Sequence, residues 1–409
     1  MNKKNKLKLF NDPIYGFITI PNSQVFDLIE HKYFQRLRRI SQMGMSYLVF
    51  PGAHHTRFHH ALGSMHLMQK AVQVLRFKGV EISSKEEDAL YLSILLHDIG
   101  HGPFSHAMEH SIVEQLNHEQ ISVRFMEVLN ENFNGSLTLP IEMFKGTYVK
   151  TFMCQLISSQ LDMDRADYLR RDSFYTGVPE GNINSERLIT MLNVVDNQLV
   201  IEEKGIYSVE KFLLARRLMY WQVYLHKTGL VAEQLLIRVL KRAKELTNNG
   251  VSLKASDPLL YFLKNRVGLN DFTDVILDLF ARLDDSDILS AMKDWQYHDD
   301  FVLSNLCDMI INRDLLKIRI KNKEIDNDSL QKHKDNLIKK YRITPEEADY
   351  FVFSGTIENL AYHELEGNIN ILTREGKVKD VVKLSDHLNL KALSKPVVKH
   401  FICYPKNKL

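Results

Sequence analysis

The stretch that decides the fold reads Leu95-Leu96-His97-Asp98-Ile99-Gly100-His101-Gly102-Pro103-Phe104-Ser105-His106. It follows an apolar run in which Leu90, Ile94 and His97 recur at three- and four-residue spacing, a pattern that predicts one face of a helix. Gly100 and Pro103 then predict the end of that helix. A buried imidazole costs free energy unless its nitrogens have partners. Three histidines at a buried helix end therefore indicate a site rather than ordinary packing.

The adjacent pair His97-Asp98 offers one imidazole nitrogen and one carboxylate oxygen, a mixture that divalent metals accept. Two further ligands are expected, one upstream and one downstream. Such a set leaves positions open for water and for a phosphate oxygen, which the ion would polarise. A closed structural zinc site would need more cysteine, so manganese, magnesium, iron, cobalt or catalytic zinc is expected. The predicted ligands are His60, His97, Asp98 and Asp164.

Phosphoester hydrolysis also needs a proton donor for the leaving oxygen and cations that balance the charge on the phosphate. The nearest spare imidazoles are those of His101, His106 and His118, and the sequence does not choose the acid among them. Glu109 and Glu119 are near enough in sequence to orient one of these rings. The cationic side chains that can meet phosphates are Arg57, Arg165 and Arg216.

Two of these regions also have an ordinary structural interpretation. The aspartates between 162 and 167 alone would indicate an acidic helix face, with at least one of them solvated or paired with a nearby arginine. The arginines between 36 and 39 would indicate an ordinary charged face. Only their occurrence together with the histidine cluster favours a functional role.

Composition narrows the class of protein. The chain has 409 residues, 44% hydrophobic and 25% charged, as in soluble globular proteins. Its formal net charge of +2 gives nucleic-acid binding little support. Three widely spaced cysteines suit a reducing compartment. Because no apolar stretch has the length of a membrane span or signal peptide, we expect a cytoplasmic protein without a membrane partner.

The pattern along the chain predicts a mostly α fold with a smaller α+β C-terminal lobe. We expect a helical core over 1–250 and the lobe, first helical and then α+β, over 251–409. Helical patterns cover 23–75 with an interruption at 50–52, and also 86–98, 118–129, 150–172 and 209–246. Strand patterns cover a hairpin at 7–21, a strand pair at 199–201 and 205–207, and 316–320, 369–372, 378–382 and 399–404.

Six motifs in this order resemble the HD-domain deoxynucleoside triphosphate triphosphohydrolases. They are Phe34-Gln35-Arg36-Leu37-Arg38, Val49-Phe50-Pro51-Gly52-Ala53, 57–63, 97–106, His118-Glu119 and 161–172. The resemblance covers about residues 12–227, and the segments near 395–397 and 403–405 are similar to the C-terminal lobe of bacterial members. It implies an HD-domain helical core. It also implies cleavage of a dNTP between its 5′ oxygen and the α-phosphate, giving a deoxynucleoside and inorganic triphosphate.

The resemblance carries roles onto matching residues of this chain. It implies the metal ligands His60, His97, Asp98 and Asp164. It implies that His101, His106 and His118 line the triphosphate, with His106 or His118 as general acid and Glu119 in support, while Glu109 stands where the pattern has Asp. Phosphate contacts are implied for Arg57, Arg165, Tyr168 and Arg216. The deoxyribose would meet Gln42, Asp172 and Tyr224, with Tyr168 excluding a ribose 2′-hydroxyl.

Partners follow from the same resemblance. It implies a homo-oligomer, dimer or tetramer, and an activating nucleotide, although Glu30 stands where the activation pattern has Asp. Two alternatives stay open. The chain could be an HD phosphohydrolase for another nucleotide, such as a monophosphate, a signalling nucleotide or a modified nucleotide. It could also be a non-catalytic relative that binds nucleotides or nucleic acid.

Overall fold

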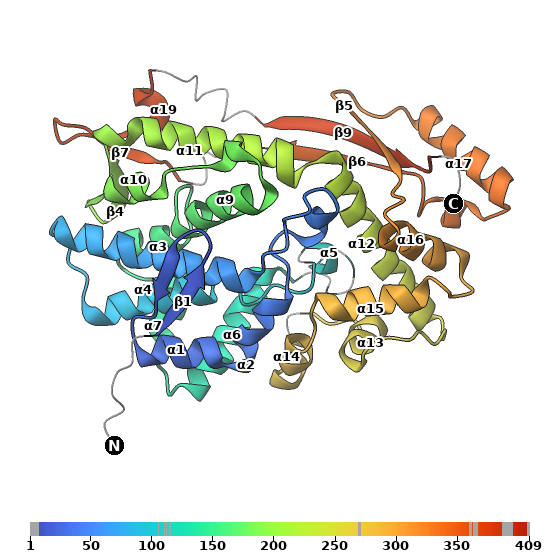
Figure 1. Ribbon diagram of the computed structural model, residues 1–409, viewed down its shortest axis with the longest axis horizontal. Coiled ribbons are helices and arrows are strands. Elements are labelled where there is room, and N and C mark those ends of the chain that lie inside the picture. The colour runs from blue at the N-terminus through green and yellow to red at the C-terminus, as the bar shows by residue number, and fades with distance from the viewer. Residues whose placement is uncertain are drawn as a thin grey trace.

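The computed structural model describes residues 8–104, 106–109, 111, 113, 116–268, 271–359, 362, 367–386 and 396–406. Helices dominate this part of the chain, and the strands β5, β6, β7 and β9 lie along the top of the view, whereas the hairpin that contains β1 lies lower, beside α3 and α4 (Figure 1). The expected mostly α class is therefore confirmed. A continuous cluster of buried apolar side chains extends from Ile18 to Tyr404, across the proposed boundary at residue 250, which stays a prediction.

The chain begins with the expected hairpin. Strand β1 (Leu9–Asp12) pairs antiparallel with β2 (Gly16–Thr19). The Asp12 carboxylate accepts hydrogen bonds from the backbone N–H groups of Ile14 and Tyr15 at 2.9 and 3.0 Å. This local turn closes the hairpin, since a short acidic side chain can bond to the backbone two or three residues on.

The elements that carry the predicted site come next. After them, α10 (Ser185–Thr190) leads to the four-stranded sheet. Helix α3 packs against both α4 and α9. The elements are α1 (Ser23–Glu30), α2 (Lys32–Gln35), the 3₁₀ turns η1 (Arg36–Arg39) and η2 (Gly44–Leu48), α3 (Arg57–Phe77), α4 (Ser84–Leu96), α5 (His106–Glu109), α6 (His118–Asn132), α7 (Thr138–Phe144), α8 (Thr151–Ile157) and α9 (Met163–Thr176).

Two helix ends in this region decide where ligands lie. Helix α4 ends at Leu96, and His97 is its C-terminal cap, so the His-Asp pair begins the turn after the helix. The single helix expected over 150–172 is divided into α8 and α9. Asp162 causes the division because its side chain caps α9, accepting from the Arg165 N–H at 2.7 Å.

The strand pair expected around Glu203 was placed wrongly. The hairpin is formed by β3 (Leu192–Val195) and β4 (Gln198–Glu202), and Ile206 already begins helix α11 (Ile206–Met219). Asp196 and Asn197 form the turn with φ of 48° and 61°. These residue types tolerate left-handed conformation, so they make a tight hairpin turn and shift the strands towards the N-terminus.

The long helix expected over 209–246 is interrupted. Helix α11 passes into a π-helical turn (Tyr220–Tyr224), and α12 (Lys227–Asn248) starts again after it. His226 caps the new helix, its Nδ1 accepting from the Thr228 N–H at 3.2 Å. The break brings Tyr224 and the start of α12 to the cavity described below.

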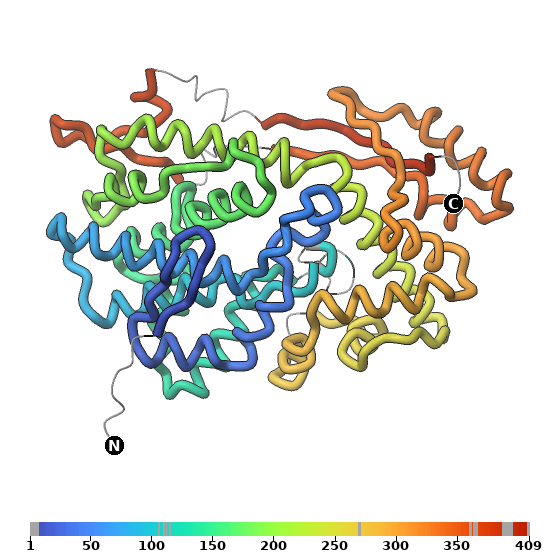
Figure 2. The backbone as a smooth tube through the Cα atoms, viewed as in Figure 1, coloured from blue at the N-terminus to red at the C-terminus, as the bar shows by residue number. Residues whose placement is uncertain are grey.

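The C-terminal part wraps around α12, which contacts α13, α16 and β5. Strand β9 lies between β5 and β6 in an antiparallel sheet, and β7 extends the β3–β4 hairpin in parallel and pairs with β8. The strands expected in this region are confirmed, except that Val381 begins α19 (Val381–Leu384). In Figure 2 the red C-terminal part of the chain lies along the top of the view. The remaining elements are α13 (Asp257–Lys264), α14 (Asp274–Ala281), α15 (Asp285–Trp295), α16 (Phe301–Ile311), β5 (Lys317–Lys321), α17 (Asn327–Tyr341), α18 (Pro345–Ala348), β6 (Phe353–Asn359), β7 (Asn370–Leu372), β8 (Val378–Asp380) and β9 (Val397–Tyr404).

Two further expectations concern cysteines and membranes. Cys154, Cys307 and Cys403 are all buried and free of disulfide bonds. Across the described residues, we find no helix with both the length and the apolar character needed to cross a membrane.

Candidate metal centre and substrate cavity

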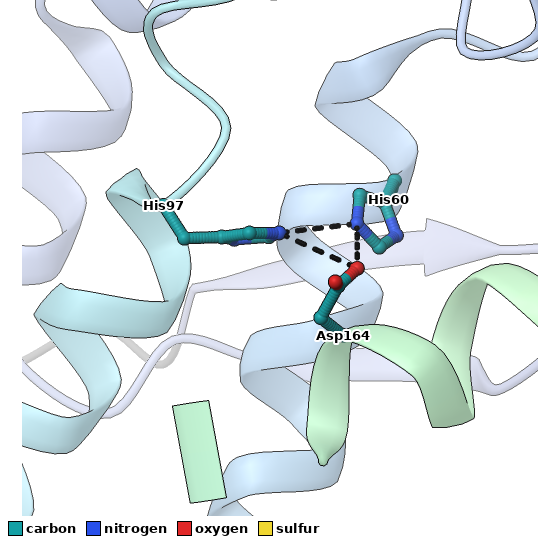
Figure 3. A group of neighbouring side chains, drawn as sticks. All are labelled: His60, His97 and Asp164. Carbon is teal, nitrogen blue, oxygen red and sulfur yellow. Dashed lines mark hydrogen bonds and ion pairs between the residues drawn. The ribbon is translucent and has the colours of Figure 1, made fainter. Parts of the chain in front are cut away.

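The four predicted metal ligands meet at one point. His60 Nε2 lies 3.3 Å from His97 Nε2 and 3.0 Å from Asp164 Oδ1 (Figure 3). Asp98 adjoins these three residues through two different oxygens, with Oδ2 3.8 Å from His60 Nε2 and Oδ1 3.4 Å from His97 Nε2, and it also forms a cluster with His101 and His118. Adjacent ligands around an ion at 2.0–2.1 Å stand about 3 Å apart, so a small contraction of this set would enclose a divalent cation. Helices α3, α4 and α9 supply the ligands or the turn that carries them.

Both imidazoles are oriented by a second buried group. His60 Nδ1 lies 2.8 Å from Asp167 Oδ2, and His97 Nδ1 lies 2.6 Å from the Ile94 carbonyl oxygen. A carbonyl only accepts, so the proton of His97 belongs on Nδ1 and the Nε2 lone pair faces the centre. Such outer partners fix ring tautomer and direction in metal sites. The donor set therefore fits a divalent metal ion.

Asp167 is itself held from two sides. Arg171 donates to both of its oxygens, at 2.8 and 3.0 Å, and Arg171 also binds Asp12 at 2.8 Å. Helix α3 approaches closely here because residue 63 is glycine, where a Cβ would collide with the Asp167 carboxylate. The chain His60–Asp167–Arg171–Asp12 thus links the metal centre to the N-terminal hairpin.

Charges around the centre favour ionised carboxylates. Burial alone would raise the pKa of Asp164, but hydrogen bonds with His60 and His97 outweigh it and hold that pKa far below its usual range. For His60, burial lowers the pKa, yet hydrogen bonds with Asp164 and Asp167 raise it to about 10. Asp164 also lies in the first turn of α9, where the helix dipole favours negative charge. Metal ligands must be deprotonated to bind, so an ion at this centre would have to displace the proton that the neighbouring carboxylates hold on His60.

A cavity of about 570 Å³ adjoins the centre, a size suited to small-molecule ligands. Helix α9 runs along it, with Asp164, Tyr168 and Asp172 facing it at four-residue spacing. Eight residues of helix span about 12 Å, so the cavity extends away from the metal ligands along α9. We call the part near Asp98 and Asp164 the metal end, and the part formed by Gln42, Tyr168, Asp172 and Tyr224 the tyrosine end.

The metal end is lined by basic and imidazole side chains. Arg57 forms an ion pair with Asp98, and His101 Nε2 lies 3.3 Å from the same carboxylate. The rings of His101 and His118 stack with centroids 3.9 Å apart. Burial and the nearby Arg57 charge hold the pKa of His101 well below its usual value. Arg165 and Glu119 also line this end.

The tyrosine end is formed by two aromatic rings, an amide and a carboxylate. Tyr224 Oη donates to Asp172 Oδ2 at 2.7 Å, and His55 Nε2 lies 2.7 Å from Asp172 Oδ1. The Tyr168 and Tyr224 rings meet edge to face at 6.1 Å. Gln42 is placed by its backbone N–H, which donates to the His55 carbonyl at 3.0 Å.

Five predicted site residues are not placed against the cavity, and two of them are the predicted ligands His60 and His97, which lie beside Asp98 and Asp164 but do not line it. The side chains of His106 and Glu109 lie outside the described part of the chain. Arg216 is buried on α11 and donates to Gln160 Oε1 at 3.3 Å, but it does not line the cavity. Its charge acts on the buried Tyr168 hydroxyl, whose pKa burial raises and Arg216 lowers in part.

The aspartates between 162 and 167 and the arginines between 36 and 39 include residues that are not on the surface. Asp162 and Asp167 are 1% and 0% exposed, so neither belongs to a solvated acidic face, and the alternative of pairing with arginine is the correct one. Arg36 is fully buried and donates to the carbonyl oxygens of Ile99 and His101, both at 2.8 Å, so it is not part of a charged surface.

Sequence reasoning missed several contributors. Asp167 was not assigned, although its spacing of three from Asp164 and four to Arg171 carried a signal. His55 and Asp12 were also missed, and for them only the fold supplies the connection.

Comparison with known proteins identifies the family of the chain. Residues 57–172 match the family described as HD domain, and residues 183–257 match the HD associated region. The crystal structure of a phosphohydrolase from Bacteroides thetaiotaomicron superposes with a TM-score of 0.95 at 49% identity, covering 98% of this chain and 100% of that one. This chain belongs to the HD-domain phosphohydrolases.

Two further relatives match different shares of this chain. The uncharacterised YwfO of Bacillus subtilis is 33% identical over 99% of this chain and 94% of its own length. Human deoxynucleoside triphosphate triphosphohydrolase SAMHD1 is 31% identical over 58% of this chain, and the match spans 45% of the human protein. The family is thus shown by similarity over the whole chain, whereas the similarity to a protein of named substrate covers part of it.

Proposed function

We propose that this HD-domain phosphohydrolase cleaves dNTPs to a deoxynucleoside and inorganic triphosphate. One observation carries the proposal: a single cavity reaches Asp98 and Asp164, the two carboxylates beside His60 and His97, and is lined by basic side chains at that end and by two tyrosines and an aspartate at the other. A triphosphate needs cations to balance its charge, and the adjoining deoxyribose needs a close-fitting wall, so the two ends of the cavity match the two parts of a dNTP. The 31% identity to SAMHD1 supports the same substrate class.

At the metal end, His60, His97, Asp98 and Asp164 would hold a manganese, magnesium, iron, cobalt or zinc ion. The ion would supply Lewis-acid polarisation of a phosphoryl oxygen and activation of water. Arg57 and Arg165 balance the negative charge of the phosphates. His101, kept neutral by burial, contributes a hydrogen bond rather than a charge.

The departing 5′ oxygen needs a proton. His118 is well placed for this step, since it stacks on His101 at the cavity wall and is followed by Glu119, which also lines the cavity. His106 with Glu109 is the second candidate pair. In either case the imidazole transfers its proton to the 5′ oxygen as the bond to the α-phosphorus breaks.

At the tyrosine end, the ring of Tyr168 packs against the sugar and leaves no room for a 2′-hydroxyl. The hydrogen bond from Tyr224 to Asp172 fixes that wall. Gln42, in the segment between η1 and η2, contacts the sugar as well. Cytoplasmic location, a homo-oligomer and an activating nucleotide are predictions that come from the sequence and the family resemblance, and they belong to the same proposal.

A product assay tests the proposal. The protein is incubated with each of four dNTPs and four NTPs, singly and mixed, with Mn²⁺ or Mg²⁺, and the products are separated by ion-pair chromatography. Deoxynucleoside plus intact triphosphate supports the proposal. The control variants are His97→Ala, which loses a predicted ligand, and His333→Ala, a histidine of α17 that stacks on Tyr404 away from the cavity. The proposal fails if no dNTP is cleaved, or if His97→Ala is as active as His333→Ala.

A further inference from the structure

A carboxylate from the C-terminal half of the chain holds two cavity-lining segments together. Asp285, the first residue of α15, lies outside both matched family regions. Its Oδ2 accepts the Ser41 N–H at 2.8 Å, and its Oδ1 accepts the Phe104 N–H at 3.0 Å. The Asp285 side chain is buried, so both hydrogen bonds are shielded from water.

The first segment presents two proposed substrate contacts. Ser41 forms a bridge with Thr56, so the segment before Gln42 lies alongside the segment before Arg57. The Arg57 N–H donates to the Ile40 carbonyl at 3.0 Å on the same bridge. Because Asp285 binds Ser41 in this bridge, its carboxylate fixes how far Gln42 and Arg57 project into the cavity.

The second segment is the end of the loop that follows the His-Asp pair. Phe104 lines the cavity, three residues after His101, and its backbone has a φ of 49°. A non-glycine residue in the left-handed region needs support from its surroundings. The hydrogen bond from its N–H to Asp285 supplies that support. Gly44 of the first segment stands close by, since a Cβ on it would lie 3.9 Å from the Phe104 carbonyl oxygen.

Helix capping does not explain the Asp285 carboxylate. Asp284 is the N-terminal cap of α15, accepting from the Ser286 N–H at 2.9 Å, and Asp287 completes the capping box. Asp284 also pairs with Arg39. Asp285 directs both oxygens away from its own helix, one to each cavity segment. Its role is thus separable from the stability of α15.

We propose that Asp285 is a positioning residue that sets the width of the substrate cavity by fixing Ser41 and Phe104 on one carboxylate. The C-terminal helices would then act on substrate affinity although they contribute no ligand to the metal. This inference rests on the proposed function for its kinetic readout. The positions of Ser41 and Phe104 can also be followed without any substrate.

The variant Asp285→Asn is nearly isosteric but replaces one acceptor oxygen with an NH₂ group, so one of the two hydrogen bonds is lost. We expect KM for the best dNTP to rise about tenfold, as loss of a hydrogen bond to a charged group allows. We expect kcat to change less than threefold. Bound metal should be unchanged, because the ligands come from other elements. The control Asp284→Asn keeps a good capping residue on the same helix and should leave KM unchanged.

Amide hydrogen exchange of the segments containing Ser41 and Phe104 is measured on the same proteins. Faster exchange of both in Asp285→Asn, but not in Asp284→Asn, supports the inference. It is overturned if exchange at both segments equals wild type, or if Asp285→Asn loses metal or kcat with KM unchanged. If wild type cleaves no dNTP, the proposed function fails, and hydrogen exchange alone decides the inference. If Asp285→Asn does not fold, Asp285→Glu, with both oxygens on a longer side chain, is tested for the same changes.

Discussion

At the metal end of the cavity, each predicted histidine ligand has a second, buried hydrogen-bond partner. At the tyrosine end, the rings of Tyr168 and Tyr224 contact one another, and Tyr224 donates a hydrogen bond to Asp172. His60 is backed by Asp167 and then by Arg171. Tyr224 depends on Asp172, which is backed only by His55 among the contacts of the described residues. Among the described residues, the side chains at the metal end therefore have more buried partners than those at the tyrosine end.

The difference follows from what each end has to recognise. A metal centre requires charged ligands at fixed distances, and charges can be buried only when each has partners. A sugar and base are recognised mainly by shape, so aromatic surfaces and a few hydrogen bonds suffice. Changes at the metal end should therefore abolish chemistry, and changes at the tyrosine end should alter affinity and selectivity.

The largest effect is expected from Asp164→Ala, which removes a ligand. We expect bound metal to fall below stoichiometric and kcat to fall by about 10³ or more, since Lewis-acid stabilisation contributes several kcal/mol. Metal analysis and single-turnover rates measure both. Asp162→Asn, which retains a capping side chain at the same helix end, should keep its metal. Loss of metal in both variants would mean that the α9 end, rather than the ligand, was disturbed.

A smaller effect is expected one step outwards, from Asp167→Asn. The change weakens the partner of His60 Nδ1 but leaves every ligand in place, and such outer partners are typically worth 10–100-fold in metal affinity or activity. Titration with Mn²⁺ measures it. Asp12→Asn, which reaches His60 only through Arg171 and Asp167, should cost less than Asp167→Asn. If the two variants lose the same Mn²⁺ affinity, or if Asp167→Asn loses none, then Asp167 does not support His60 more directly than Asp12 does.

At the tyrosine end, Tyr224→Phe removes the hydrogen bond to Asp172. We expect KM for dNTPs to rise about three- to tenfold and the preference for dNTP over NTP to fall, because one hydrogen bond is worth about 1 kcal/mol. Bound metal should equal that of wild type. Steady-state kinetics with paired dNTP and NTP substrates measure the change. A loss of metal in this variant would contradict the separation of the two ends.

The smallest effect on catalysis is expected far from both ends, at Glu86 of α4. Burial alone would raise the pKa of this carboxylate, but hydrogen bonds from Lys150 and Tyr148 lower it to about 2. Its stabilisation is therefore complete above pH 4.5 and is lost as the pH falls towards 2. Glu86→Gln should lower the free energy of unfolding by about 1 kcal/mol at pH 7. The difference from wild type should shrink below pH 4, with kcat at neutral pH unchanged. Urea unfolding at several pH values tests this, and a difference independent of pH would contradict the assignment.

Local patterns account for the parts of the fold and site that the sequence predicts. The imidazole-rich helix end and the glycines after it predicted a site at His97-Asp98, because spacing on a helix is regular. The resemblance to the HD family, through its His, His-Asp, Asp order, then added His60 and Asp164 from other helices. The hairpin near Glu203 was misplaced because Asp196-Asn197 is an equally good turn and the tertiary packing of α11 begins at Ile206.

Contacts between distant segments account for what the sequence does not predict. Nothing near Asp285 in the chain indicates Ser41 or Phe104, which lie 244 and 181 residues away. His55 likewise meets Asp172 across 117 residues. Such groups look like ordinary surface charges in a single sequence, and only the packing of α15 and α9 against the loops gives them a role.

The most direct test of the central claim is hydrolysis of a dNTP in ¹⁸O-labelled water, with the products analysed by mass spectrometry. If the metal end directs water to the α-phosphorus, one ¹⁸O atom appears in the inorganic triphosphate and none in the deoxynucleoside. Label in the deoxynucleoside, or release of a deoxynucleoside monophosphate and pyrophosphate, would contradict the account.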